Sequence, residues 1–287
     1  MTAPRVCVQE ALRRGSRMLA VARSDEAGLE AELLLAHVLN TDRTHLYQRL
    51  RDDLTPQAES AFDALLQRRL AHEPTPYILG HKEFYGLEFE VTPDAIIPRP
   101  ETETLVELVL DCARSASARE MRIADVGVGC GAIAVALAVN LPEAEIIAID
   151  ISPQALALAR RNAQRHAVAD RVRFLEGDLL KPLDALVDVI VANLPYVRSG
   201  DFEAAPPEIN EHEPRLGLDG GPDGLRLIER MLRDAPPHLK PGGALFAEIG
   251  EEQGVAAREV ALAAFPQARI EVKQDLSRLD RVLVVRT

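Results

Sequence analysis

The sequence lacks tryptophan, and aromatic residues make up only 4% of its 287 positions. Apolar residues nevertheless account for 47%, so aliphatic side chains must fill the core. Cysteine is also scarce, because Cys7, Cys112 and Cys130 are the only three and their spacings are unrelated. This pattern fits reduced thiols better than a disulfide framework or a zinc site. The chain length predicts one full-size domain and a smaller accessory domain.

Long hydrophobic runs are absent as well. The longest, residues 132–139, is far shorter than the roughly 18 residues that a membrane span requires. The N-terminus, Met1-Thr2-Ala3-Pro4-Arg5, has neither the apolar stretch nor the small-residue cleavage site of an export signal. We therefore expect a cytoplasmic protein that does not contact membranes. The formal net charge of −12 repels a phosphate backbone, so direct nucleic-acid binding is not expected.

Histidines do not follow the spacing of a metal site. His72-Glu73 and His212-Glu213 resemble the start of a zinc-binding helix, but neither pair is followed by a second histidine at the required interval. Both pairs are interpreted as surface or structural residues. No metal is expected.

Residues 1–74 contain only helical patterns. One apolar face has Leu33, Leu34, Val38 and Leu39, and a second, at i, i+3, i+4, i+8 spacing, has Phe62, Leu65, Leu66 and Leu70. Thr55-Pro56 is typical of a helix start, and His72-Glu73-Pro74 of its end. In residues 75–101, prolines and glycines interrupt β-branched and aromatic residues. We expect a helical domain over 1–74 and a linker over 75–101 that carries a β-hairpin, with strands near 83–85 and 88–91 joined around Gly86.

From residue 102 to residue 287, apolar strand patterns alternate with helical ones, which indicates a mostly parallel sheet covered on both faces. The seven expected strands are residues 122–126, 145–149, 171–175, 187–192, 244–249, 269–272 and 281–285. Only residues 273–280 separate the last two strands, which is too short for a helical crossover. The last strand should therefore be antiparallel. The predicted fold is a Rossmann-like α/β domain of the class I methyltransferase type, preceded by an all-helical domain and a hairpin linker.

A glycine-rich turn, Asp125-Val126-Gly127-Val128-Gly129-Cys130-Gly131, follows the first expected strand and begins a helix. Glycines allow the backbone to turn tightly and to approach a ligand closely. Asp150 ends the next strand about 20 residues later, where a carboxylate can accept hydrogen bonds from ribose hydroxyls. The loop has no lysine for a phosphate, so it fits a sulfonium nucleoside better than a dinucleotide. Asp178 and Leu179 close the third strand, where they could form a wall around an adenine.

The fourth expected strand leads to Asn193-Leu194-Pro195-Tyr196 at the same edge of the sheet. Methylation of an amide or ring amine requires that the NH₂ group be held with its delocalised lone pair directed at the methyl group. The Asn193 side-chain oxygen and the Leu194 carbonyl could each accept one N–H, while Pro195 fixes the backbone and Tyr196 stacks on the planar acceptor. No strong general base is needed, because the nitrogen becomes acidic once it is cationic.

At these residues the chain resembles the release-factor glutamine N5-methyltransferases, the HemK/PrmC family. Besides the glycine loop and the tetrapeptide, the resemblance rests on Tyr77-Ile78-Leu79-Gly80, Phe84-Tyr85-Gly86, Ile97-Pro98-Arg99-Pro100-Glu101-Thr102-Glu103, Asp219-Gly220-Gly221-Pro222-Asp223-Gly224-Leu225 and Asp280-Arg281. It covers nearly the whole chain, and residues 97–103 are its most specific part.

This resemblance implies an enzyme that transfers a methyl group from S-adenosyl-L-methionine to the glutamine of a Gly-Gly-Gln motif in class 1 peptide chain release factors, leaving S-adenosyl-L-homocysteine. The helical domain would help to recognise the release factor. The residues expected at the cofactor are Asp125, Gly127, Val128, Gly129, Cys130, Gly131, Asp150, Ile151, Asp178, Leu179 and Asn193. Those expected at the substrate are Asn193, Leu194, Pro195, Tyr196, Arg99 and Glu101, with a purely structural ion pair as the alternative role of Arg99 and Glu101.

Leu194 departs from the family pattern, which usually has Asn-Pro-Pro-Tyr. Asn-Leu-Pro-Tyr is similar to the tetrapeptide of adenine-N6 ribosomal RNA dimethyltransferases, so an N6-adenine methyltransferase acting on RNA or DNA is the alternative function. Any residue supplies a carbonyl, so the geometry that holds the nitrogen can survive, although the loop is less rigid. Leu179 likewise replaces an aromatic residue of some members. A third interpretation is a non-catalytic module that binds release factor, and the intact glycines and Asn193 disfavour it.

Overall fold

The computed structural model describes residues 6–22, 24, 26–115 and 120–287 of the chain. The first five residues, on which part of the expectation about an export signal rests, lie outside the described residues. The chain forms two compact units, Met1–Gly80 and His81–Thr287, which are described separately. None of the helices in the described part of the chain is both long enough and apolar enough to cross a bilayer.

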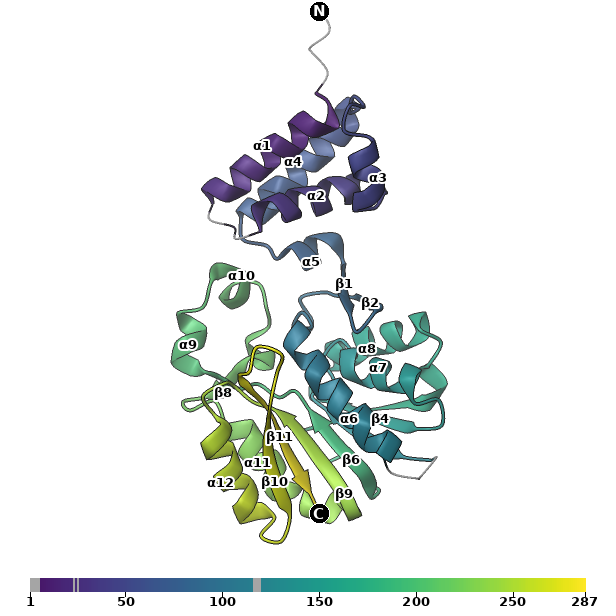
Figure 1. Cartoon of the computed structure of the whole chain (residues 1–287), viewed down its shortest axis with the longest axis vertical. Helices are drawn as coiled ribbons and strands as arrows, with labels where there is room; N and C mark the ends of the chain where they lie inside the picture. The colour runs from purple at the N-terminus through teal and green to yellow at the C-terminus, as the bar shows by residue number, and fades with distance from the viewer. Residues whose placement is uncertain (1–5, 23, 25, 116–119) are drawn as a thin grey trace, which may run out of the picture. The chain divides into compact units, whose positions relative to one another are not determined.

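The first unit is entirely helical in its described part, as the apolar spacing predicts (Figure 1). Its helices are α1 (Val8–Val21), α2 (Ala27–Val38), α3 (Arg43–Gln48), α4 (Pro56–Leu70) and α5 (Thr75–Leu79). The predicted start of α4 is confirmed, because the Thr55 side chain accepts a hydrogen bond from the Ala58 amide and Pro56 occupies the first turn. Phe62 and Leu66 are completely buried in the core of this unit together with Leu34 of α2.

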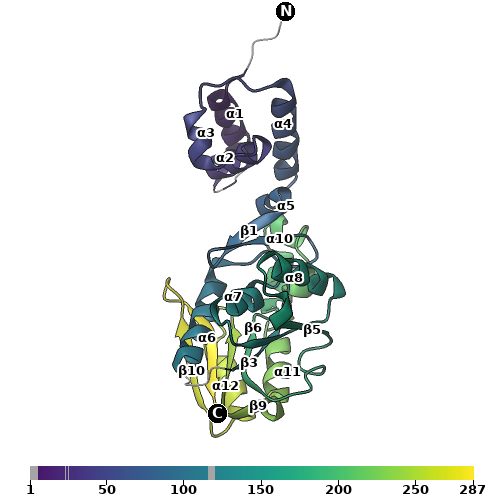
Figure 2. The ribbon, with the colours of Figure 1, turned by 90° about the vertical axis from the view of Figure 1, so that its right-hand side faces the viewer.

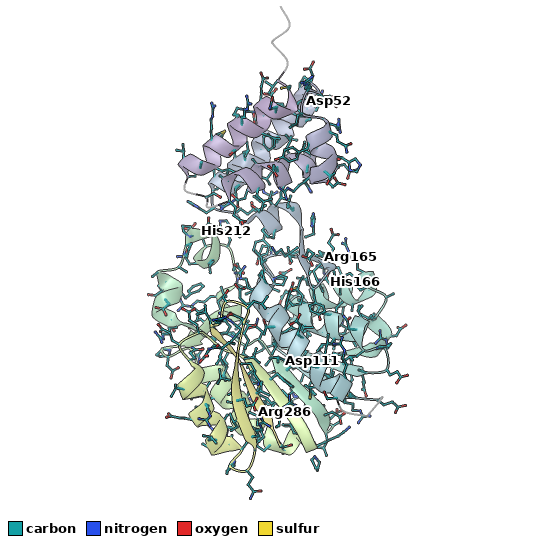
Figure 3. All side chains as sticks on the ribbon, in the orientation of Figure 1. Asp52, Asp111, Arg165, His166, His212 and Arg286 are labelled. Carbon is teal, nitrogen blue, oxygen red and sulfur yellow. The ribbon has the colours of Figure 1, made fainter. Side chains whose placement is uncertain are left out.

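A two-stranded hairpin begins the second unit. Strands β1 (His81–Phe84) and β2 (Leu87–Glu90) pair antiparallel, and Tyr85 and Gly86 form the two-residue turn, both with positive φ. The hairpin packs on a helix about 70 residues further along the chain, α8 (Pro153–Arg165), where the Asn162 side chain accepts a hydrogen bond from the Glu90 amide and donates one to its carbonyl. Figure 3 shows Arg165 and His166 at the end of α8, and His166 Nε2 lies 2.9 Å from the carbonyl oxygen of Glu88.

The remaining elements build a seven-stranded sheet with helices on both sides (Figures 1 and 2). Its strands are β3 (Arg122–Val126), β4 (Glu145–Asp150), β5 (Val172–Glu176), β6 (Val187–Ala192), β9 (Leu239–Glu248), β10 (Arg269–Gln274) and β11 (Asp280–Arg286). Their order is β10-β11-β9-β6-β3-β4-β5, so the last strand lies between the two that precede it and is antiparallel to both. The seven predicted strands and the antiparallel last strand are confirmed.

Helices α6 (Glu103–Ser115), α7 (Ala132–Asn140) and α8 cover one face, and α11 (Arg226–Asp234) and α12 (Gly254–Ala264) cover the other. The strands are apolar on both sides for this reason: Ile146 and Ala148 of β4 pack towards α7, whereas Ile147 and Ile149 pack towards the opposite face.

Several short elements, which the sequence patterns did not predict, complete the second unit. They are η1 (Pro100–Thr102), η2 (Ala169–Arg171), β7 (Val197–Arg198), α9 (Ser199–Glu203), α10 (Pro207–Asn210), η3 (Arg215–Gly217), β8 (Asp219–Gly221) and η4 (Pro236–His238). Strand β9 also begins five residues earlier than expected. The sequence did not predict these residues as strand because Gly242-Gly243 is a pattern typical of a turn. Gly242 has φ +78°, and the pairing of β6 with β9 is irregular at this point.

Candidate active site

A cavity of about 700 Å³ opens at the carboxyl ends of β3, β4 and β6. This is the edge of an open α/β sheet where ligands bind. Most of the lining comes from loops that follow the strands, and α11 contributes Arg226, Leu227 and Arg230. The other lining residues are 94–96, 126, 127, 129, 149–152, 155, 177–179, 193–195, 214–217 and 219. All of these residues belong to the second unit. The glycine loop and the tetrapeptide therefore face one common cavity.

The glycine loop is held against the end of β4. The amides of Gly127 and Val128 both donate to the Ile149 carbonyl, at 2.8 and 3.0 Å. Gly127, Gly129 and Gly131 have φ values of +81°, +55° and +87°, a region that other residues rarely adopt. A Cβ on Gly127 would lie 3.0 Å from Cδ2 of Leu194, and one on Gly131 would lie 3.1 Å from Ala159. The loop therefore needs glycine both for its conformation and for its close packing.

Asp150 lies where the sequence predicts a ribose-binding carboxylate. Its Oδ2 accepts a hydrogen bond from the Gly129 amide and its Oδ1 one from the Ser152 amide, both at 2.9 Å. These bonds orient the carboxylate at the cavity wall. Burial raises its pKa above the ordinary value, and the two amide donors oppose that shift.

Asp125 lies in the core beneath the loop and does not line the cavity. Its side chain is completely buried, and neither carboxylate oxygen has a hydrogen-bond partner of good geometry among the described residues. Burial raises its pKa to about 7; the Ala134 amide offsets part of this rise, and the negative charge of Asp150 adds to it. Asp125 is therefore a titratable group in the physiological range.

Asp178 and Leu179 close the cavity beyond β5. The Asp178 carboxylate lies 2.7 Å from Lys181 Nζ and 2.6 Å from Arg230, and these hydrogen bonds lower its pKa. Leu179 is buried with φ +53°, and it packs in the same core cluster as Ile149. The arrangement provides an apolar wall beside a carboxylate that is fixed by two cations.

The tetrapeptide after β6 places three of its residues, Asn193, Leu194 and Pro195, in the cavity lining. Asn193 Nδ2 donates to the Thr102 hydroxyl over 3.0 Å. The backbone of the tetrapeptide packs closely on β8, where a Cβ on Gly220 would lie 2.6 Å from the Pro195 carbonyl oxygen. This close approach explains why glycine is needed in that strand.

Tyr196 is held by two hydrogen bonds at the end of the tetrapeptide. Its hydroxyl donates to Oε1 of the buried Glu248 over 2.9 Å, and its carbonyl accepts a hydrogen bond from the Gln253 side chain at the same distance. Burial and the neighbouring Glu248 charge raise the pKa of Tyr196. The ring is therefore fixed at the end of β9, and it is not among the residues that line the cavity.

Arg99 pairs with a carboxylate that the sequence patterns did not associate with it. Its guanidinium contacts Glu213, which is 6% exposed and also accepts a hydrogen bond from the Ile97 amide. Glu101 is exposed, and neither Arg99 nor Glu101 lines the cavity. This geometry is consistent with the alternative role of Arg99, a structural ion pair, although its partner is Glu213 and not Glu101.

The expected residues thus divide into two groups. Those that line the cavity are Gly127, Gly129, Asp150, Ile151, Asp178, Leu179, Asn193, Leu194 and Pro195. Those outside its lining are Asp125, Val128, Cys130, Gly131, Tyr196, Arg99 and Glu101. Val128, Cys130 and Gly131 belong to the loop itself, whose alternate residues turn towards the core.

Three parts of the wall were not anticipated. Residues 94–96 follow the hairpin, residues 214–217 include η3, and Arg226, Leu227 and Arg230 lie on α11. The spacing of the α11 residues places them on one face of a helix, but a mixed arginine and leucine face has no signature of a binding site. Asp219, which also lines the cavity, could have been found from the sequence, because it begins one of the motifs on which the family resemblance rests.

The fold and the cavity define a class I methyltransferase. Residues 102–209 match the family model described as "Methyltransferase small domain" and residues 10–80 match the "PrmC N-terminal domain". A methyltransferase from Pyrococcus furiosus of known structure is similar in fold, with a TM-score of 0.52 at 16% identity, over 79% of this chain and 98% of that one.

Two curated relatives are similar over nearly their whole length. The release factor glutamine methyltransferase of Moorella thermoacetica is 42% identical over 96% of both chains, and that of Geobacter sulfurreducens is 43% identical over 90% of this chain and 89% of its own. The chain belongs to the family of release factor glutamine methyltransferases.

Proposed function

We propose that this enzyme transfers a methyl group from S-adenosyl-L-methionine to the side-chain amide nitrogen, N5, of the glutamine in the Gly-Gly-Gln motif of class 1 peptide chain release factors. The products are N5-methylglutamine and S-adenosyl-L-homocysteine, and the modification tunes translation termination. The observation that carries this proposal is the single cavity shared by the glycine loop, Asp150 and Asn193, in a chain that belongs to this family over both of its units.

The cavity fits the cofactor in shape and chemistry. The missing Cβ of Gly127 leaves room next to Leu194, Asp150 presents a carboxylate suited to ribose hydroxyls, and Leu179 with Ile149 forms an apolar wall suited to an adenine. When bound, S-adenosyl-L-methionine supplies an electrophilic methyl group on a cationic sulfur. We assign Gly127, Gly129, Asp150, Ile151, Asp178 and Leu179 to direct contact with it. Asp125, Val128, Cys130 and Gly131 shape the loop.

Asn193 and Leu194 hold the acceptor nitrogen. The Asn193 Oδ1 and the Leu194 carbonyl each accept one N–H of the substrate amide, which directs the nitrogen lone pair at the methyl group. As the N–C bond forms, the nitrogen becomes cationic and acidic, and one of the two held protons is released. No strong base is required for this release. The carbonyl of Leu194 serves as well as that of the proline usually found in the family.

The two units have separate tasks in this proposal. Residues 1–74 recognise the release factor, residues 75–101 connect the units and contribute the hairpin, and residues 102–287 carry out the transfer. The hairpin packs on α8, so the connection is anchored to the catalytic part. The substrate belongs to the translation apparatus, and we place the enzyme with it in the cytoplasm. The net charge of −12 opposes direct contact with nucleic acid.

One assay separates this proposal from the alternatives. The protein is incubated with methyl-labelled S-adenosyl-L-methionine and with either purified release factor or ribosomal RNA. We expect label on the release factor, and we expect it to disappear when the Gly-Gly-Gln glutamine is replaced. Label on RNA alone would instead support adenine methylation, and label on neither would support a binding module.

The role of Asn193 has its own test in the same assay. Asn193→Ala removes one acceptor from the substrate nitrogen, so we expect transfer to fall by about 100-fold or more. Cofactor binding, measured by calorimetry, should remain detectable because the glycine loop and Asp150 are unchanged. Wild-type turnover of this variant would contradict the assigned role.

A further inference from the structure

The orientation of the Asn193 side chain is set from behind the cavity. Its Nδ2 donates to the Thr102 hydroxyl over 3.0 Å, and Thr102 is only 3% exposed. A carboxamide has one donor end and one acceptor end. With the donor end held by Thr102, Oδ1 is the end that remains free to accept a hydrogen bond from a ligand in the cavity.

Thr102 lies in η1, outside the cavity lining. Its hydroxyl oxygen accepts the hydrogen bond from Asn193 Nδ2, so it holds the donor end of the carboxamide.

We infer that Thr102 is a positioning residue, which fixes the Asn193 carboxamide with its oxygen towards the cavity and so selects an acceptor nitrogen that carries hydrogens. This inference rests on the proposed function. The Thr102 side chain does not line the cavity, so Thr102 is not a catalytic residue.

Loss of the hydrogen bond between Asn193 and Thr102 would lower turnover without weakening the binding of the cofactor. A rotated Asn193 would present its NH₂ group to the NH₂ group of the substrate, and two donors cannot pair. The substrate amide would then be held by the Leu194 carbonyl alone. Among the described residues, the hydrogen bonds of the glycine loop and Asp150 do not involve Thr102, so the affinity for S-adenosyl-L-methionine should be preserved.

The decisive comparison is Thr102→Val with Thr102→Ser. Valine has the shape of threonine but no hydroxyl, whereas serine keeps the hydroxyl. We expect Thr102→Val to lower kcat for release factor by about 10- to 100-fold with less than about threefold change in KM for the cofactor, and Thr102→Ser to stay within about threefold of wild type. Wild-type kcat for Thr102→Val, or an equal loss in both variants, would overturn the role of Thr102. Thermal melting of Thr102→Val and Thr102→Ser establishes that the measured losses come from folded protein.

A measurement without substrate separates this inference from the proposed function. The side-chain amide protons of Asn193 can be followed by ¹⁵N NMR in the wild type and in Thr102→Val. We expect slow solvent exchange in the wild type and faster exchange in the variant, because the Nδ2 hydrogen bond is lost. Equal exchange rates would overturn the inference even if release factor is methylated. Failure to methylate release factor, with the difference in exchange intact, would overturn only the proposed function.

Discussion

A Cβ on Gly127 would lie 3.0 Å from Cδ2 of Leu194, so the first glycine of the cofactor loop packs directly against the residue that departs from the usual tetrapeptide of the family. Leu194 is 4% exposed and belongs to the core cluster on the α11 and α12 face of the sheet. The leucine therefore anchors the loop by packing, where a proline would stiffen its backbone. Its side chain also lines the cavity.

We expect Gly127→Ala to weaken cofactor binding by about tenfold or more and to destabilise the protein by about 1–2 kcal/mol, because φ is +81° and Leu194 blocks the new methyl group. Calorimetric titration with S-adenosyl-L-methionine and urea denaturation measure the two effects. Gly200→Ala is the matched control, since a Cβ on Gly200 would have no atom within 4 Å and the φ of this residue is not positive. Equal behaviour of the two variants would contradict the packing argument.

We expect Arg99→Met to destabilise the protein by roughly 3 kcal/mol, because it leaves the buried Glu213 carboxylate without its cation. The double variant Arg99→Met/Glu213→Gln should recover most of that loss, since the glutamine can still accept the hydrogen bond from the Ile97 amide. Urea denaturation of the three proteins gives the comparison.

Turnover of the same double variant distinguishes the two roles weighed for Arg99. A structural ion pair predicts that activity recovers together with stability. A stable double variant whose turnover stays more than about tenfold low would show that Arg99 contacts the substrate.

We expect Asp125→Asn to change the pH dependence of stability in the absence of cofactor. The pKa of Asp125 is raised to about 7 in the folded protein from an ordinary value of 3.8. Folding therefore favours the protonated form, and this contribution is complete below about pH 4 and is lost as the pH rises through 7. A shift of this size corresponds to about 4 kcal/mol. Asparagine does not titrate, so the variant should not lose this stability as the pH rises.

The stability gained by Asp125→Asn relative to wild type should accordingly grow between pH 5 and pH 8, which thermal melting at each pH can measure. Asp111→Asn serves as the control, because the side chain of Asp111 is 73% exposed. A stability difference between Asp125→Asn and wild type that is independent of pH would mean that Asp125 stays ionised throughout this range.

Local signals in the sequence were sufficient to predict much of the secondary structure of both units. Alternating apolar runs predicted the seven strands of the large sheet, and the short interval before residue 281 predicted that the last strand is antiparallel. The turn around Gly86 predicted the hairpin, and Thr55-Pro56 predicted the start of α4. These signals succeed because strand burial, turn conformation and helix capping depend on neighbouring residues.

The sequence by itself also determined the family and the two halves of the cavity, since the glycine loop and Asn193-Leu194-Pro195 follow strands whose carboxyl ends must meet. Only the tertiary structure decided which distant side chains complete the site. It directs Tyr196 to Glu248, Asn193 to Thr102 and Arg99 to Glu213, pairs separated by 52, 91 and 114 residues. The pairing of β6 with β9 brings Tyr196 to Glu248, and the folding of segments outside the sheet brings the other two pairs together. Periodicity along the chain carries no information about either.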